Sequence, residues 1–240
     1  MRTSSAPLLP QQIHPALWRG TQLASQAQRC LDSGHPALNR ELPGGGWPLG
    51  TLIDLMPSLP GIGEIHLLQP ALRQLDGRPI ALLAPPQPPH IACWTDWQLA
   101  PQQLLWLQPQ RLNDTLWAAD QILRHDTCGA LLCWAHPVTH EALRRLHLSA
   151  QAGNTLFFLL RPAQASQHPS PAPLRLSLAP AEQGLDVTLL KRRGPTCPSP
   201  IRLHTHTAPP VLTPLPAHEP LDRPASAQPR TGRLAPALAG

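Results

Sequence analysis

Short apolar runs that alternate with helical segments constrain the fold of this chain more than any other feature. The runs at 51–56, 79–84, 129–135 and 155–160 have the length and composition of strands that are buried on both faces of a sheet. Segments with apolar residues at helical spacing lie between runs, as at 65–75. Parallel strands need crossover connections of this kind. The sequence therefore predicts an α/β fold with a mostly parallel sheet.

The apolar pattern changes after Pro173. Apolar and polar residues then alternate in two segments, 174–178 and 185–189, as they do in strands with one face exposed to solvent. Gly184 lies where the chain must turn between these segments. This pattern predicts an antiparallel hairpin at an edge of the sheet.

Three other segments complete the expected elements. Residues 15–33, between Pro15 and Gly34, have the end signals and the spacing of a first helix. The run at 104–107 predicts a further strand. Asn113 is expected to cap the helix that follows this strand.

Composition divides the chain into a folded domain and two ends. Proline is abundant, with 33 residues, and many of them follow Gly194. A segment rich in Pro, Ala and Thr has too few large apolar side chains to offset the entropy that folding costs. We therefore expect a flexible N-terminus at 1–12, one α/β domain at 13–203 and a disordered Pro-rich tail at 204–240.

Nothing in the sequence marks a membrane segment or a metal centre. There is no run of about 18 apolar residues and no signal peptide, so we expect a cytoplasmic protein that does not bind membranes. His204 and His206 lack further ligands at useful spacing. Five cysteines without CxxC spacing predict reduced, mostly buried thiols. They are Cys30, Cys93, Cys128, Cys133 and Cys197.

The segment 45–56, GGWPLGTLIDLM, resembles the start of the ATPase core of the bacterial recombinase RecA. In RecA a Gly-Gly-x-Pro-x-Gly turn precedes the first core strand and the phosphate loop. The segments at 154–159, 174–176 and 187–191 are similar to later RecA strands in the same order. The resemblance covers 13–203 and implies a RecA-like P-loop core.

Within that superfamily the sequence most resembles the ImuA family of translesion-synthesis accessory proteins. Five motifs of that family occur here in order. They are ELPGGGWPLG at 41–50, PGIGE at 60–64, LRRL at 143–146, SPAPLRL at 170–176 and LLKRRGP at 189–195. The resemblance implies a role in error-prone synthesis during the DNA-damage (SOS) response. The implied partners are the Y-family-like protein ImuB and a DnaE-type polymerase, and RecA itself is a further candidate.

The expected phosphate loop lacks the residues that hydrolysis needs. Such a loop uses Gly residues to surround phosphates, a Lys to reach the β/γ oxygens and a Ser or Thr to bind magnesium. Aligning 56–63 on GxxxxGK[ST] places Met56 at the first Gly, Ile62 at the Lys and Gly63 at the hydroxyl residue. The strand at 131–134 lacks the metal-supporting Asp. The strand that in RecA leads to the water-activating Glu ends here in Pro85 and Pro86.

We therefore interpret Pro60, Gly61, Ile62, Gly63 and Glu64 as a degenerate phosphate loop, and we expect neither catalysis nor a cofactor. Glu64 is expected to complement the dipole of the helix that it starts. A vestigial anion site at this helix N-terminus is the alternative.

Two groups of residues are candidates for partner binding. Trp94 and Trp97 follow a Pro-rich loop, where an exposed aromatic pair would anchor a protein partner. The other tryptophans lie in or beside expected core elements. Lys191, Arg192 and Arg193 form the clearest basic cluster, although the simpler interpretation is a solvated strand end.

Two alternative functions remain open. The region 116–162 resembles SulA-type cell-division inhibitors, which would act on FtsZ. A formal charge of +5 also fits a basic DNA-binding module. The sequence does not distinguish direct contact with DNA from contact through partner proteins.

Overall fold

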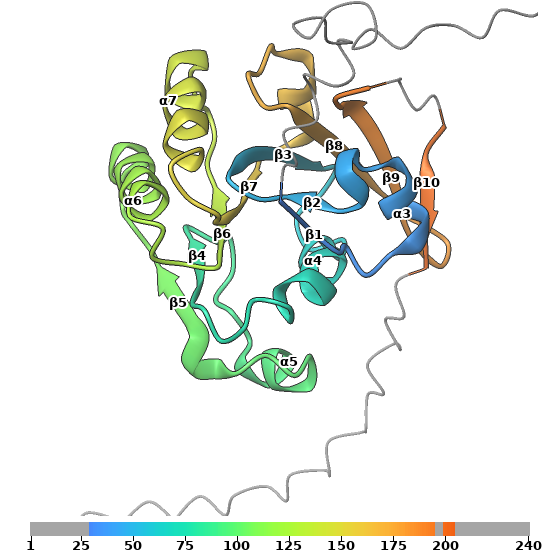
Figure 1. Ribbon diagram of the computed structural model, residues 1–240, viewed down its shortest axis with the longest axis horizontal. Helices are drawn as coiled ribbons and strands as arrows, with labels where there is room; N and C mark the ends of the chain where they lie inside the picture. Colours follow the sequence, from blue (N-terminus) through green and yellow to red (C-terminus); the bar gives the residue numbers. More distant parts are fainter. Residues whose placement is uncertain (1–28, 195–198, 205–240) are drawn as a thin grey trace, which may run out of the picture. The chain divides into compact units, whose positions relative to one another are not determined.

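One sheet of eight strands runs through the part of the protein that the computed structural model describes, residues 29–194 and 199–204 (Figure 1). The strand order is β10-β9-β8-β3-β7-β6-β4-β5. From β8 to β5 all neighbouring strands are parallel, whereas β9 is antiparallel to both β8 and β10. The prediction of an α/β fold with a mostly parallel sheet is therefore confirmed. The strands are β3 Thr51–Pro57, β4 Ile80–Leu83, β5 Leu104–Leu107, β6 Ala130–Trp134, β7 Leu156–Leu160, β8 Leu174–Ala181, β9 Gly184–Lys191 and β10 Ile201–Leu203.

Helices cover the sheet on both sides (Figure 1). The α-helices are α3 Pro36–Glu41, α4 Glu64–Leu72, α5 Ile91–Asp96, α6 Leu112–Arg124 and α7 His140–Ala150. Three 3-10 turns, η1 Pro43–Gly45, η2 Pro101–Gln103 and η3 Ala163–Gln167, and a small sheet of β1 Cys30–Leu31 and β2 Trp47–Pro48 complete the described elements. No helix among the described residues is long and apolar enough to cross a membrane.

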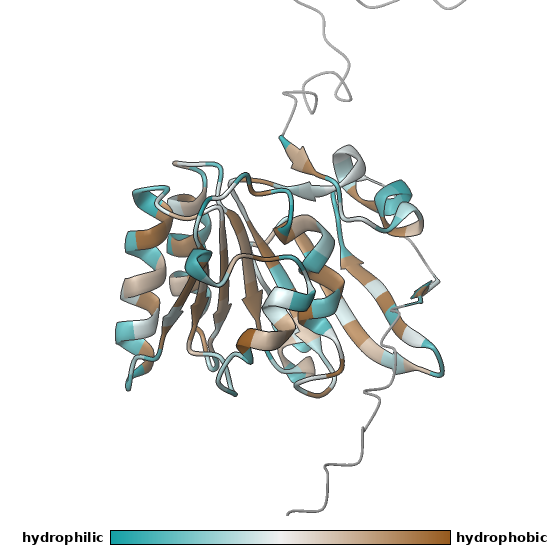
Figure 2. Ribbon diagram, turned by 90° about the horizontal axis from the view of Figure 1, so that it is seen from below, coloured by the Kyte–Doolittle hydropathy of each residue, from teal (hydrophilic) through white to brown (hydrophobic). Residues whose placement is uncertain are grey.

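Strand β3 contributes to the hydrophobic core on both faces of the sheet. All seven of its residues are buried. Ile53 and Leu55 join the cluster that includes α4, while Leu52 joins the cluster formed with α6 and α7. Figure 2 shows the apolar strands between the helices. A continuous apolar run is what a strand in this position requires, because each face of it is covered.

The expected first helix at 15–33 is wrong at its C-terminal end. Cys30 and Leu31 form strand β1, in which Leu31 pairs with Trp47. Trp47 is fully buried and packs edge-on against Phe158, with ring centroids 5.1 Å apart. Pairing with the segment that carries this tryptophan overrides the local helical pattern. The rest of the expected helix lies outside the described residues.

Two smaller expectations are also corrected. Helix α6 begins at Leu112 with Arg111 at its N-cap, so Asn113 lies inside the first turn. The predicted hairpin is present as β8 and β9, but β10 pairs with 185–187 and is the edge strand. Three residues are too few for a recognisable alternation of apolar and polar positions. The expected N-terminus at 1–12, the tail from 205 onward, and Cys197 and His206 lie outside the described residues.

A buried ion cluster joins the central strands. Asp54 of β3 is fully buried and accepts a hydrogen bond from Arg161 Nε at 2.8 Å and one from Arg175 Nε at 3.1 Å. Arg161 also donates from Nη2 to the second oxygen of Asp54. Arg161 directly follows β7 and Arg175 lies in β8, the two neighbours of β3. One carboxylate in the middle of β3 therefore joins the C-terminal end of β7 and the N-terminal end of β8 to this strand.

Replacing this carboxylate is expected to destabilise the fold strongly. Asp54→Asn leaves two buried guanidinium groups without a negative partner, which typically costs about 3–5 kcal/mol. The matched control is Asp186→Asn, which breaks the exposed pair with Arg202 at 3.0 Å and should cost about 0–1 kcal/mol. Urea denaturation of both variants measures the difference in their free energies of unfolding. Equal losses of stability would contradict a structural role for the buried cluster.

Candidate functional site

The connection between β3 and α4 contains the residues interpreted as a degenerate phosphate loop, an interpretation that stays a prediction. Gly61 has φ 81° and Gly63 has φ 110°, so both residues adopt the left-handed conformation that favours glycine. Gly63 is the N-cap of α4 and offers no side chain to the helix amides. The loop therefore turns its backbone N–H groups toward the start of the helix.

The carboxylate of Glu64 occupies the position to which these amides point. The Gly61 N–H donates to Glu64 Oε1 at 2.9 Å, and the Gly63 N–H donates to Oε2 at 3.2 Å. Glu64 is 4% exposed. In a working phosphate loop, backbone amides of this kind surround the phosphates of the nucleotide. Here a side chain of the protein itself supplies the anion.

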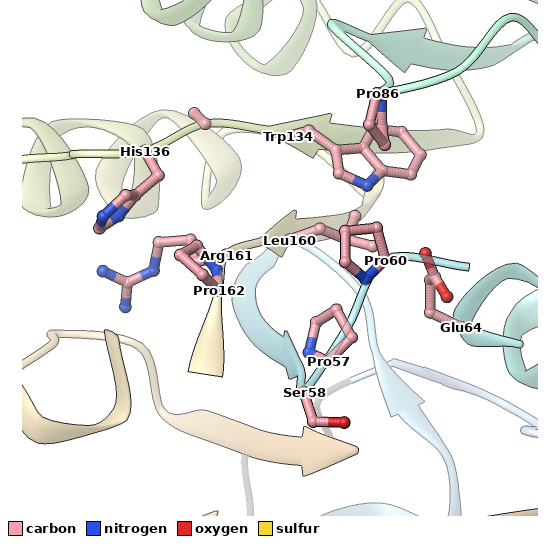
Figure 3. A pocket seen from close by; sticks show the side chains of 11 residues that line it. Pro57, Ser58, Pro60, Glu64, Pro86, Trp134, His136, Leu160, Arg161 and Pro162 are labelled. Carbon is pink, nitrogen blue, oxygen red and sulfur yellow. The ribbon is translucent and has the colours of Figure 1, made fainter. Parts of the chain in front are cut away.

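An apolar cavity of about 260 Å³ lies beside this loop (Figure 3). Its walls come from the ends of β3, β6 and β7 and from the Pro-rich segment after β4. The rings of Pro57, Pro60, Pro86 and Trp134 supply much of its surface. Its lining includes no lysine, and Arg161 directs its guanidinium to Asp54. The cavity therefore suits apolar atoms better than a chain of phosphates.

A second cavity, of about 380 Å³, continues from Pro60 and Glu64 toward the Pro-rich segment 85–89 and α5. Trp94 and Trp97 line it, with ring centroids 5.8 Å apart. Trp94 is 3% exposed and belongs to the core, and Trp97 is half-buried. The expectation of an exposed aromatic pair is therefore wrong. The partner role of these two residues stays a prediction.

The exposed tryptophans lie elsewhere. Trp106 in β5 is 51% exposed and Trp117 in α6 is 64% exposed. Leu105 and Leu107 also expose large parts of their side chains along β5, the edge strand opposite β10. Sequence reasoning assigned both tryptophans to packing. The strand itself was predicted at 104–107, but its exposed apolar side chains were not, and the absence of charged residues between Asp96 and Arg111 is the signal that could have drawn attention to this segment.

The basic cluster at the end of β9 is partly engaged in internal contacts. Lys191 Nζ donates to the carbonyl oxygen of Ser170 at 3.0 Å. Arg192 Nη1 donates to Glu41 Oε2 at 2.8 Å, and its side chain is only 14% exposed. Strand β10 pairs with 185–187 only, so it does not cover this end of β9. Partner binding by Lys191, Arg192 and Arg193 stays a prediction.

These cations also act on a histidine of α7. Burial is the main cause that lowers the pKa of His147, and the charges of Arg193 and Lys191 lower it further. His147 Nδ1 accepts a hydrogen bond from the Leu52 N–H at 3.3 Å. A neutral imidazole can accept this bond, so the basic end of β9 favours the observed contact between α7 and β3.

The cysteines of the described region are free thiols. Cys128 and Cys133 are buried, Cys30 is half-buried and Cys93 is exposed. Burial raises the pKa of Cys133 to about 12, which removes its thiolate at neutral pH. No three or more His, Cys, Asp or Glu residues gather as metal ligands within 29–194 and 199–204.

Comparison with known proteins shows a partial relation to SulA. A scan against models of protein families finds no match. The cell division inhibitor SulA of Pectobacterium atrosepticum is 36% identical over 104 residues, which make up 42% of this chain and 61% of that protein. This chain thus spans about three fifths of the length of the curated relative that it matches. It contains a SulA-like segment.

A solved structure of SulA from Pseudomonas aeruginosa is also similar. It matches with a TM-score of 0.37 and 24% identity, over 45% of this chain and 97% of the SulA chain. A superposition of this quality adds nothing to the fold described above. The relation to SulA, which the sequence analysis ranked second, is the one that comparison shows, and membership of the ImuA family stays a prediction.

The contact of Glu64 with the loop can be tested by its contribution to stability. Glu64→Ala leaves two backbone donors without their acceptor, which should cost about 1–2 kcal/mol beyond the loss of a charge at the helix start. Glu141→Ala is the matched control, because Glu141 lies in the first turn of α7 and is exposed. Urea denaturation compares the free energies of unfolding of the two variants. Equal costs would show that Glu64 acts only on the helix dipole.

Proposed function

We propose that this protein is a non-catalytic accessory factor that binds other proteins during error-prone translesion synthesis. The observation that carries the proposal is the carboxylate of Glu64, which accepts the N–H groups of Gly61 and Gly63. A triphosphate at this loop would have to displace a buried anion of the same sign. Like charges at such short range repel strongly, especially away from bulk water.

Other positions support a non-catalytic role. Ile62 and Gly63 offer neither an ammonium group for the β/γ oxygens nor a hydroxyl for magnesium. Cys133, near the C-terminal end of β6, is fully buried and its raised pKa leaves it uncharged. Pro85 and Pro86 follow β4, where a water-activating carboxylate would be expected. Each missing group would otherwise stabilise the charge of the transition state.

The ImuA-like motifs support the assignment because polar contacts join three of the five, namely the first, fourth and fifth. Glu41 of the first motif pairs with Arg192 of the fifth at 2.8 Å. Lys191 of the fifth motif donates to Ser170 of the fourth at 3.0 Å. Glu64 belongs to the second motif and closes its loop. Several of these motifs are therefore joined by polar contacts that build one scaffold.

The uncharged edge at β5 is the surface that we propose for a protein partner. Leu105, Trp106 and Leu107 expose apolar side chains there, and in the described residues β4 is the only strand that pairs with β5. An edge strand without charged side chains can accept a further strand. Exposed tryptophans are frequent hot spots of interfaces. By the ImuA resemblance the partner is an ImuB-like Y-family protein, with a DnaE-type polymerase and RecA as further members of the assembly.

A SulA-like inhibitor of cell division is the second candidate function. The relation to SulA of Pectobacterium atrosepticum favours it, since 104 residues align at 36% identity. The target implied by that resemblance is FtsZ. The SulA-like segment and the ImuA-like motifs belong to one chain, so only binding experiments separate the two functions.

Binding by purified proteins tests the proposal. The full chain is expected to capture an ImuB-like protein and not FtsZ. Trp106→Ser should weaken this capture by more than about tenfold, equivalent to about 1.4 kcal/mol, because it removes an exposed aromatic anchor. Trp117→Ser is the matched control and should change affinity by less than about twofold, since it removes a tryptophan of α6 that is equally exposed.

Capture of FtsZ without an ImuB-like protein would reject the accessory role and favour the second candidate. Equal effects of Trp106→Ser and Trp117→Ser would show that β5 is not the binding edge. Thermal unfolding of both variants serves as a check that each one is folded.

A further inference from the structure

A cavity of about 330 Å³ lies between the connection from β6 to α7 and the segment around η3. It shares His136 and Arg161 with the cavity of about 260 Å³ beside the loop, but Glu64 lines that other cavity and not this one. Eight residues form its walls, and none of them carries a carboxylate. Arg161 and three histidines supply its polar groups.

Arg161 brings a buried positive charge to this cavity. Its side chain is only 3% exposed. Asp54 accepts from Nε and Nη2 of Arg161, and the same carboxylate also accepts from Arg175. Two guanidinium groups thus share one carboxylate, which leaves one excess positive charge. Arg175 has additional acceptors in the carbonyl oxygens of Ala165 and Ser166.

The second amino group of Arg161, Nη1, makes no hydrogen bond to the described residues. A guanidinium presents five N–H donors, and Asp54 accepts only those of Nε and Nη2. Buried charges are stable when they are paired and their donors are satisfied. Among the described residues Nη1 of Arg161 is not one of the fully enclosed atoms without a partner, so its donors are open to the cavity and can bind an anion there.

Three histidines line the cavity together with Arg161. His136 follows β6, His140 is the first residue of α7, and His168 follows η3. All three are exposed. Figure 3 shows that the side chains of His136 and Arg161 point in the same direction, away from Glu64. An imidazole can donate an N–H to an oxyanion in its neutral form and in its charged form.

We propose that this cavity binds a phosphate-type oxyanion. A dianion would compensate the excess charge of the buried cluster and accept charge-assisted hydrogen bonds from Arg161. The three histidines would supply further donors at the rim. The site includes no residue of the loop after β3 or of the β5 edge, so its ligand would be additional to the protein partner proposed above.

Calorimetric titration with inorganic phosphate and pyrophosphate at low ionic strength tests the site. The full chain should bind one anion in a saturable manner. The triple variant His136→Ala, His140→Ala, His168→Ala should bind at least about tenfold more weakly, because it loses three donors at the rim. All three positions are exposed, so the fold should be almost unaffected.

The control is the double variant His90→Ala, His125→Ala, which removes two exposed histidines outside this cavity. It should retain the affinity of the unmodified protein. Absence of saturable binding would overturn the proposal. So would equal losses in the triple variant and the control, because anion binding would then reflect surface charge alone.

A competition experiment identifies the source of the phosphate. A fluorescent single-stranded oligonucleotide that pyrophosphate displaces, and that the triple histidine variant does not bind, would identify a nucleic-acid backbone as the ligand. Saturable pyrophosphate binding without such competition would identify a small phosphate compound. Oligonucleotide binding that neither pyrophosphate nor the histidine changes affect would place the nucleic-acid contact elsewhere.

Discussion

The pairing of Asp54 with Arg161 and Arg175 determines the centre of this structure. Asp54 is fully buried in β3, and its two partners come from the strands on either side. Because a buried carboxylate is stable only with compensating donors, the cluster fixes how β3, the C-terminal end of β7 and the N-terminal end of β8 lie beside one another. The loop and its cavity follow β3, and the segment around η3 connects β7 to β8. The buried cluster that stabilises the core thus also positions the loop and the cavities that are candidates for binding.

Glu64 provides the loop after β3 with a carboxylate partner from within the chain. The geometry that usually attracts phosphate is present, with left-handed glycines and inward amides at the start of a helix. The carboxylate satisfies those amides within the chain. A loop of this kind keeps its shape without a ligand, so it can serve as a fixed part of a binding surface. The proposed accessory function follows from this combination of a retained scaffold and an internally satisfied loop.

Much of the sheet was predictable because its strands are distinctive. A strand covered on both faces needs a continuous apolar run, and a strand with one face exposed to solvent needs alternation, as 51–56 and 185–189 illustrate. The exposure of single residues was less predictable. Trp94 lies in α5 and is buried in the core, whereas Trp106 lies in the edge strand β5 and is exposed. The edge position of β5 depends on strand order, and strand order depends on crossovers that no local pattern encodes.

Contacts between motifs that are far apart in the sequence could not be predicted either. Glu41 and Arg192 are 151 positions apart, and only folding brings them to 2.8 Å. The loop glycines indicated an anion site in general terms, but the identity of the anion depended on the rotamer of Glu64. The same limit applies to Arg161, whose neighbours in space come from three separate segments.

Magnesium-dependent ATP turnover by the purified full chain tests the central claim most directly. If Glu64 occupies the phosphate position, and positions 62 and 63 supply neither a lysine nor a hydroxyl, phosphate release should equal that of a sample without protein, at any magnesium concentration. Turnover that requires magnesium and disappears when residues 61–64 are changed would contradict the account, because it would show that this loop still handles a nucleotide.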